Sequence, residues 1–86
     1  MFTLRVVAEV DPDKRLEFHQ AIRTFQKLSK GDLHRFYQSL DSEGSYCLLM
    51  DCEESQDLEE YLASSQFQFF SGAASVLGRI VDAEII

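Results

Sequence analysis

Apolar and polar residues alternate along several stretches of the chain, as they do in strands that are buried on one face. From Phe2 to Val10 the even-numbered residues form an apolar face, whereas the odd-numbered residues form a mixed one. The same period predicts strands over 32–40, 45–51 and 79–86. In the last of these, one face is predicted to carry Val81, Ala83 and Ile85.

A helical period replaces this alternation after the first strand. Asp11 is expected to cap the helix with its side chain, and Pro12 suits the first helical position because it lacks an amide hydrogen. The helix is predicted to run to Ser29, because Gly31 is a favourable stop. Its buried stripe is predicted to comprise Leu16, Phe18, Ala21, Ile22, Phe25 and Leu28.

Two shorter helices are predicted between the third and fourth strands. Glu54 or Ser55 is expected to cap the first, and the acidic residues that follow suit the positive end of a helix dipole. The run 63–65 separates it from a second segment whose phenylalanines recur at helical spacing. Gly78 ends that segment.

The resulting order of strand, helix, strand, strand, helical segment and strand predicts one α+β domain over residues 1–86. It is typical of the ferredoxin-like βαββαβ fold, in which a four-stranded antiparallel sheet carries helices on one face. Residues 41–44 are predicted to form the hairpin turn, with Gly44 available for a positive φ. The uncovered face carries apolar groups from several strands, so a homodimer packed sheet on sheet is expected.

The charge of the chain limits the classes of partner that it is expected to bind. The net charge is −7, and no Lys or Arg occurs between Phe36 and Gly78. This balance argues against nucleic acid and against anionic membrane surfaces. The acidic run is interpreted as a solvated helix face, with a basic partner or cation as the alternative.

Neither of the two cysteines suggests a metal centre. Cys47 and Cys52 are five residues apart on one predicted strand, so they point to opposite faces and cannot bridge each other. Without histidines at ligand spacing they do not form a zinc site. They are interpreted as small buried hydrophobic residues in a reducing compartment, and the absence of a leader pattern or a long apolar run predicts a cytoplasmic protein.

Several short motifs resemble the antibiotic biosynthesis monooxygenase-like domains of the dimeric α/β-barrel superfamily. Residues 48–52 (LLMDC) match the end of a strand in that family, and Leu58 matches a helix leucine. The pair Tyr61-Leu62 stands where His-Leu is usual, and 63–67 (ASSQF) matches a segment of small residues and a phenylalanine. The resemblance implies the ferredoxin-like fold, and its assembly into a dimeric α/β barrel.

The chain also departs from that family. Cys52 and Tyr61 stand at the usual Trp and His positions, and the residues that haem-degrading relatives use are missing. The resemblance therefore implies a cofactor-independent monooxygenase-like enzyme that acts on a small aromatic or quinol substrate. The alternative is a non-catalytic dimeric module of the same fold that binds a small molecule or a protein. No cofactor and no metal is expected in either case.

The candidate site residues follow from residue type and predicted position. His34 is the preferred general base, because imidazole titrates near neutral pH, and Tyr61 is a candidate donor to a substrate oxygen. His19 ranks below His34, because it is expected at the edge of the first helix. Substrate contacts are assigned to Arg5, Tyr37, Tyr46 and Phe67. For each of these residues the alternative is a purely structural role in the core or at the surface.

Overall fold

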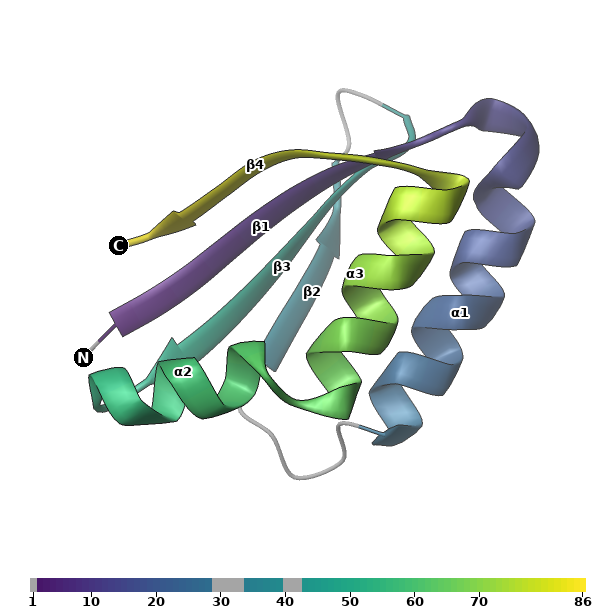
Figure 1. The fold of residues 1–86 in the computed structure, drawn as a ribbon. Helices are drawn as coiled ribbons and strands as arrows, with labels where there is room; N and C mark the ends of the chain where they lie inside the picture. Colours follow the sequence, from purple (N-terminus) through teal and green to yellow (C-terminus); the bar gives the residue numbers. More distant parts are fainter. Residues whose placement is uncertain (1, 29–33, 40–42) are drawn as a thin grey trace.

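The fold is described here from a computed structural model, which covers residues 2–28, 34–39 and 43–86 (Figure 1). The predicted helix end at Ser29 and the stop at Gly31 lie outside the described residues, as do the outer ends of the predicted second strand. The elements in chain order are β1 (Phe2–Val10), a 3₁₀ turn (Pro12–Lys14), α1 (Arg15–Leu28), β2 (His34–Gln38), β3 (Ser45–Cys52), α2 (Ser55–Leu62), α3 (Ser65–Leu77) and β4 (Gly78–Ile85).

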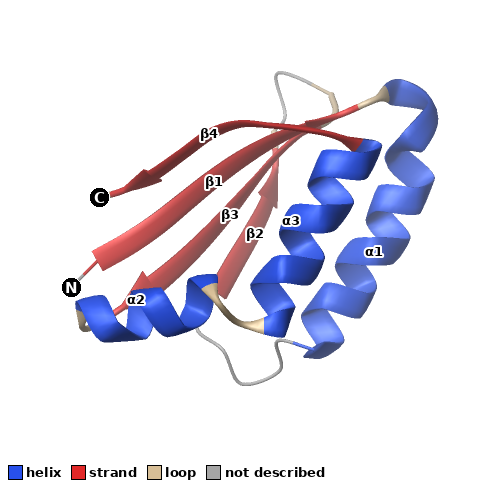
Figure 2. Ribbon diagram, in the orientation of Figure 1, coloured by secondary structure: helices blue, strands red, loops and turns tan. Residues whose placement is uncertain are grey.

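The strands form one antiparallel sheet in the order β2-β3-β1-β4. All three α-helices lie on the same side of this sheet, with α1 and α3 side by side and α2 across one end (Figure 2). The predicted ferredoxin-like fold is therefore confirmed. The sheet of the single chain is open and does not close into a barrel.

The core lies between the sheet and the helices. In β1 and β3 the even-numbered residues from Leu4 to Val10 and from Tyr46 to Cys52 are buried, as the alternation predicts. The helices contribute the remaining buried apolar side chains, which are Phe18, Ile22, Phe25, Leu58, Tyr61, Phe70 and Ala74. Leu16 and Leu28 were predicted in this stripe, and that was wrong: they are 70% and 49% exposed at the two ends of α1.

Of the two helix caps that the sequence predicts, the cap of α2 is confirmed and the cap of α1 is wrong, whereas α3 has a cap that was not predicted. Ser64 caps α3 by accepting a hydrogen bond from the backbone N–H of Phe67 at 3.2 Å, and Glu54 occupies the N-cap of α2. The predicted side-chain cap by Asp11 was wrong. Instead, the Asp11 backbone carbonyl accepts from the amide of Lys14 at 2.9 Å, because a 3₁₀ turn precedes α1.

A register shift in β4 alters which of its residues face the helices. Val7 pairs with Asp82, but the next residue, Ala8, pairs with Ile80, so Val81 is an extra residue at a β-bulge. The predicted alternation is therefore interrupted at Val81, whereas Ala83 and Ile85 pair with Val6 and Leu4 and so share one face. Cross-strand pairing puts Ile80 on the face of buried Ala8 instead.

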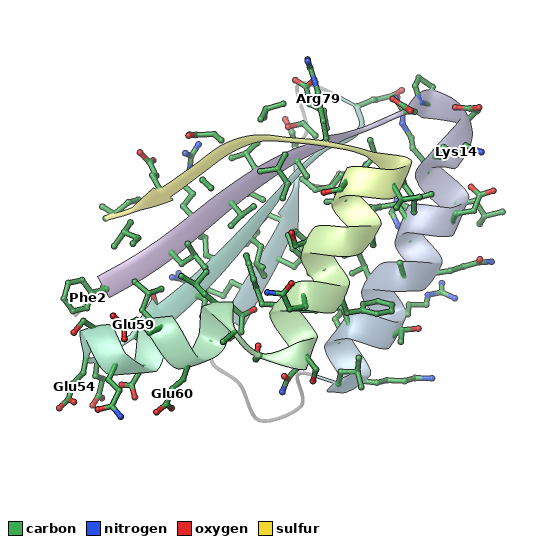
Figure 3. The ribbon with its side chains drawn as sticks, viewed as in Figure 1. Phe2, Lys14, Glu54, Glu59, Glu60 and Arg79 are labelled. Carbon is green, nitrogen blue, oxygen red and sulfur yellow. The ribbon has the colours of Figure 1, made fainter. Side chains whose placement is uncertain are left out.

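The acidic face of α2 is solvated, as the charge pattern predicts. Glu54, Glu59 and Glu60 are exposed, and Figure 3 shows Glu54 and Glu60 pointing away from the sheet. Among the described residues, no helix is long and apolar enough to cross a membrane.

Candidate functional site

A continuous series of aromatic rings fills the space between the sheet and the helices. Its ring centroids lie 4.8–6.4 Å apart from one neighbour to the next. The series is formed by Phe18 and Phe25 of α1, Phe36 of β2, Tyr46 of β3, Tyr61 of α2, and Phe67 and Phe70 of α3. Candidate polar groups for chemistry therefore lie at the edges of an aromatic interior.

One edge of this interior carries a histidine–tyrosine pair. Nε2 of His19, on α1, lies 2.8 Å from the hydroxyl of Tyr46, on β3, within hydrogen-bonding distance. Tyr46 is 2% exposed, whereas His19 is exposed to solvent. The pair thus joins an accessible imidazole to a phenol that is sheltered from water.

Two features of the surroundings of Tyr46 shift the pKa of its hydroxyl in opposite directions. Burial raises the pKa of the Tyr46 hydroxyl, because the anion would lose its hydration. The nearby cationic Arg15 acts in the other direction and lowers it. Phe36 stacks on the Tyr46 ring at 5.7 Å with a 17° interplanar angle, and Phe18 packs at 4.8 Å. The ring is therefore held in a fixed orientation.

Two other predicted site residues meet at the opposite end of the aromatic series. Tyr61 is 6% exposed and packs on Phe67 with ring centroids 5.5 Å apart and an interplanar angle of 55°. Phe67 also lies 6.4 Å from Phe70. The structure therefore brings Tyr61 and Phe67 together, at the junction of α2 and α3.

Arg5 and Tyr37 lie on the other side of the sheet. Arg5 forms ion pairs of 2.9 Å with Asp82 and with Glu84, and the hydrogen bond to Asp82 raises the pKa of its guanidinium. Tyr37 is 50% exposed and stands opposite Cys47 in the register. These two residues are separated by the sheet from Tyr46, Tyr61 and Phe67.

His34, which the sequence favours as the general base, is the first residue of β2 and pairs with Met50 of β3. Its side chain lies outside the described part of the chain. The pairing of His19 with Tyr46 was not foreseen, since the two residues are 27 positions apart and no short motif joins them. A weak signal was available, because His19 follows core Phe18 on the helix and Tyr46 lies on the apolar face of its strand.

Within the described ranges, no group of three or more His, Cys, Asp or Glu side chains could hold a metal ion. Cys52 is buried, and this burial, with Asp57 and Asp51 nearby, raises the pKa of its thiol. Cys47 lies on the opposite face, as predicted, but it is partly exposed there and not buried as expected. In this environment Cys52 is disfavoured as a thiolate nucleophile.

The same fold occurs in several solved structures. A protein described as an antibiotic biosynthesis monooxygenase has a TM-score of 0.82 at 10% identity, covering 100% of this chain and 94% of that one. A protein from Mycobacterium tuberculosis has a TM-score of 0.82 at 16% identity, covering 99% and 91%. A candidate antibiotic biosynthesis monooxygenase from Nitrosomonas europaea has a TM-score of 0.77 at 16% identity, covering 100% and 94%.

The sequence matches no family model, and a search of curated proteins found no match. At identities of 10–16% the likeness to the solved structures shows the fold. That fold is the one found in antibiotic biosynthesis monooxygenases, so the resemblance seen in the sequence motifs is confirmed at this level.

Proposed function

We propose that this protein is a cofactor-independent monooxygenase-like enzyme that acts on a small aromatic or quinol substrate. The observation that carries the proposal is the hydrogen bond between His19 and Tyr46. It places an imidazole, the side chain that most often serves as a general base, at the accessible edge of an aromatic interior. Support comes from the fold, which also occurs in a protein described as an antibiotic biosynthesis monooxygenase.

In this proposal His19 is the general base. Tyr46 occupies Nε2, so Nδ1 is the ring nitrogen that meets a substrate. A hydrogen bond from Nε2–H to the Tyr46 oxygen would fix the tautomer in which Nδ1 carries a lone pair. This is the role that an orienting partner plays for a catalytic histidine. Geometry and residue type thus give the imidazole one bound nitrogen and one reactive nitrogen.

The chemistry needs no electron donor besides the substrate. His19 removes a proton from an activated CH₂ group, and the resulting carbanion attacks O₂ to form a C–O bond and a peroxide anion. The peroxide takes back a proton from His19. Loss of the second C–H proton with O–O cleavage then forms a carbonyl group and water. The overall change is CH₂ + O₂ → C=O + H₂O, in which the carbon is oxidised and the oxygen is reduced.

Oxygen uptake with a panel of quinols and anthrone-like compounds tests this function. Replacing His19 with Gln is expected to lower kcat/KM by about 10²–10⁴, the usual contribution of a general base. Gln20→Ala, an exposed change on the same helix, is the matched control. Tyr61→Phe and His34→Ala test the two other catalytic candidates. Unchanged uptake in His19→Gln would overturn the assignment of the base.

We also propose that the protein is a homodimer joined through the uncovered sheet face. Val7, Cys47 and Leu49 lie half-buried near the middle of this face, and Tyr37 is half-exposed beside them. An 86-residue chain has a thin core, so burial of this face in a partner would add stability.

A second function is favoured by the tightness of the aromatic interior. Phe18, Phe70 and Tyr46 are at most 2% exposed, and this close packing suits a structural core. The alternative is therefore a non-catalytic dimeric module of the same fold that binds a small molecule or a protein. It predicts aromatic ligand or protein binding without oxygen uptake in the same panel, and with no change in binding for His19→Gln.

A further inference from the structure

The residue one helical turn before His19 is Arg15, so both side chains lie on the same face of α1. Arg15 begins the helix and reaches over the turn that leads into β3. Its Nη1 lies 3.1 Å from Oε2 of Glu43, and its side chain is 31% exposed. The cation is therefore fixed at the end of β3 where Tyr46 lies.

Gly44 lets the guanidinium come this close. A Cβ at Gly44 would lie 3.1 Å from both Nε and Nη2 of Arg15 and 2.9 Å from the backbone oxygen of Val10. Gly44 also has a φ of +82°, which glycine adopts readily, and its carbonyl accepts from the Val10 amide at 2.8 Å. The turn is thus anchored to β1. It leaves room for the Arg15 side chain because Gly44 has no side chain.

One nitrogen of the Arg15 guanidinium, Nε, is left without a hydrogen-bond acceptor among the described residues. Glu43 is exposed and contacts Nη1, whereas the buried Nε has no acceptor among the described residues. On β1 and β2, the residues opposite Tyr46 are Ala8 and Gln38, which carry no charge. Among the described residues, the charged or titratable groups that act on the Tyr46 hydroxyl are His19 and Arg15 from α1, and Glu43 is paired with Arg15.

We propose that Arg15 is a positioning residue for the His19–Tyr46 pair, with its cation placed to stabilise negative charge on the Tyr46 oxygen. This inference rests on the proposed function and adds to it a proton relay from His19 to Tyr46. His19 takes the substrate proton at Nδ1 and passes its Nε2 proton to the Tyr46 anion. The reactive state is then the one with Tyr46 deprotonated, and the peroxide later recovers the proton by the reverse path.

The electrostatic balance at Tyr46 agrees with this role. Burial raises the pKa of the hydroxyl and would suppress the anion at neutral pH, whereas Arg15 opposes that rise. Loss of the cation leaves the effect of burial uncompensated. The pKa of Tyr46 is therefore expected to rise in Arg15→Gln, and catalysis that depends on the anion is expected to require a higher pH.

The test is an NMR titration of protein labelled with ¹³C at the tyrosine ζ carbon, with the Tyr46 signal identified by its loss in Tyr46→Phe. Arg15→Gln should raise the pKa of Tyr46, and Arg15→Lys, which keeps the charge, should hold it near the wild-type value. Arg23→Gln, an exposed change two turns along α1, should leave it unchanged. An unchanged Tyr46 titration in Arg15→Gln would overturn the proposal.

The pH profile of oxygen uptake provides the second readout. In Arg15→Gln the rising limb of kcat/KM should move to higher pH, with a loss of roughly tenfold at neutral pH and near-complete rescue in Arg15→Lys. If Arg15→Gln shifts the titration of Tyr46 but not the rising limb of kcat/KM, the proposed proton relay is overturned. If the wild type consumes no oxygen, the proposed function fails, whereas the tyrosine titration still decides whether Arg15 controls Tyr46.

Discussion

The two faces of the sheet differ in the interactions that their side chains form. The helix-covered face is apolar and aromatic, and its strand residues on β1 and β3, from Leu4 to Val10 and from Tyr46 to Cys52, are at most 9% exposed. The opposite face carries ion pairs and half-buried apolar groups side by side. Arg5 pairs with Asp82 and Glu84 there, Arg35 pairs with Asp51, and Arg79 pairs with Glu9.

This difference separates two roles in the molecule. Close packing of rings fixes the fold of one chain, because every ring depends on its neighbours for burial. On the other face the charged side chains named above are already paired within the chain, so a partner can cover the apolar centre without breaking these pairs. The difference suggests that the candidate chemistry belongs to the edge of the first face and that the second is suited to assembly.

The largest effect is expected from a cavity in the covered face. Phe70 is 1% exposed and contacts the rings of Phe25, Phe36 and Phe67. Phe70→Ala should lower the free energy of unfolding by about 3–5 kcal/mol, measured by urea denaturation. Val76→Ala on the same helix, where the side chain is 80% exposed, should cost less than about 0.5 kcal/mol. Similar losses in both variants would contradict the packing described for this face.

The next effect concerns the uncovered face and its partner. Leu49 is half-buried between Arg5 on β1 and Arg35 on β2 in the strand register. Leu49→Asp should weaken the proposed dimer by at least a hundredfold, because a carboxylate in the interface would have to be desolvated. Analytical ultracentrifugation measures the dissociation constant, with Glu53→Gln, a change at an exposed residue just after β3, as control. A dimer that persists unchanged would show that another surface joins the chains.

A smaller effect is expected at alkaline pH, and it belongs to the covered face. The pKa values of Tyr46 and Cys52 are raised by burial, so the unfolded chain releases these protons at lower pH than the folded chain. The folded state then binds more protons above about pH 9–10, and the free energy of unfolding should fall as pH rises. Urea midpoints measured from pH 7 to 11 should decline less steeply in Tyr46→Phe and in Cys52→Ser. Equal slopes in the variants and the wild type would rule out these two groups.

The smallest effect is expected from an exposed ion pair on the uncovered face. Arg79 and Glu9 stand opposite each other on β4 and β1 at 2.9 Å, with side chains 74% and 51% exposed. A double-mutant cycle with Arg79→Ala and Glu9→Ala should give a coupling of less than about 1 kcal/mol, decreasing with added salt. A larger, salt-independent coupling would mean that this pair is shielded from water in the assembled protein.

Most of the fold could be predicted because its signals are local. Alternation defines β1, the run 63–65 separates α2 from α3, and Gly44 marks the hairpin turn. The bulge at Val81 could not be predicted, since it depends on how β4 aligns with β1 and leaves the apolar pattern of β4 unchanged. Leu16 has the right spacing for the core, but it lies at the end of α1, where little protein covers it.

The candidate site was predicted only in part. Tyr46, Tyr61 and Phe67 lie on the helix-covered side and border the aromatic interior. The alternation of β1 already places Arg5 on the face opposite Leu4, but residue type alone kept it among the site residues. The contact between His19 and Tyr46 depends on how α1 is rotated over the sheet, which no local pattern specifies.

The measurement that tests the account most directly is oxygen uptake per chain by His19→Gln and Leu49→Asp, assayed together with the wild type on the same substrate. The account predicts that His19→Gln loses at least a hundredfold in kcat/KM, whereas Leu49→Asp keeps its activity within about threefold after it dissociates. Loss of activity in Leu49→Asp with retention in His19→Gln would contradict it, and would place the chemistry at the interface between chains.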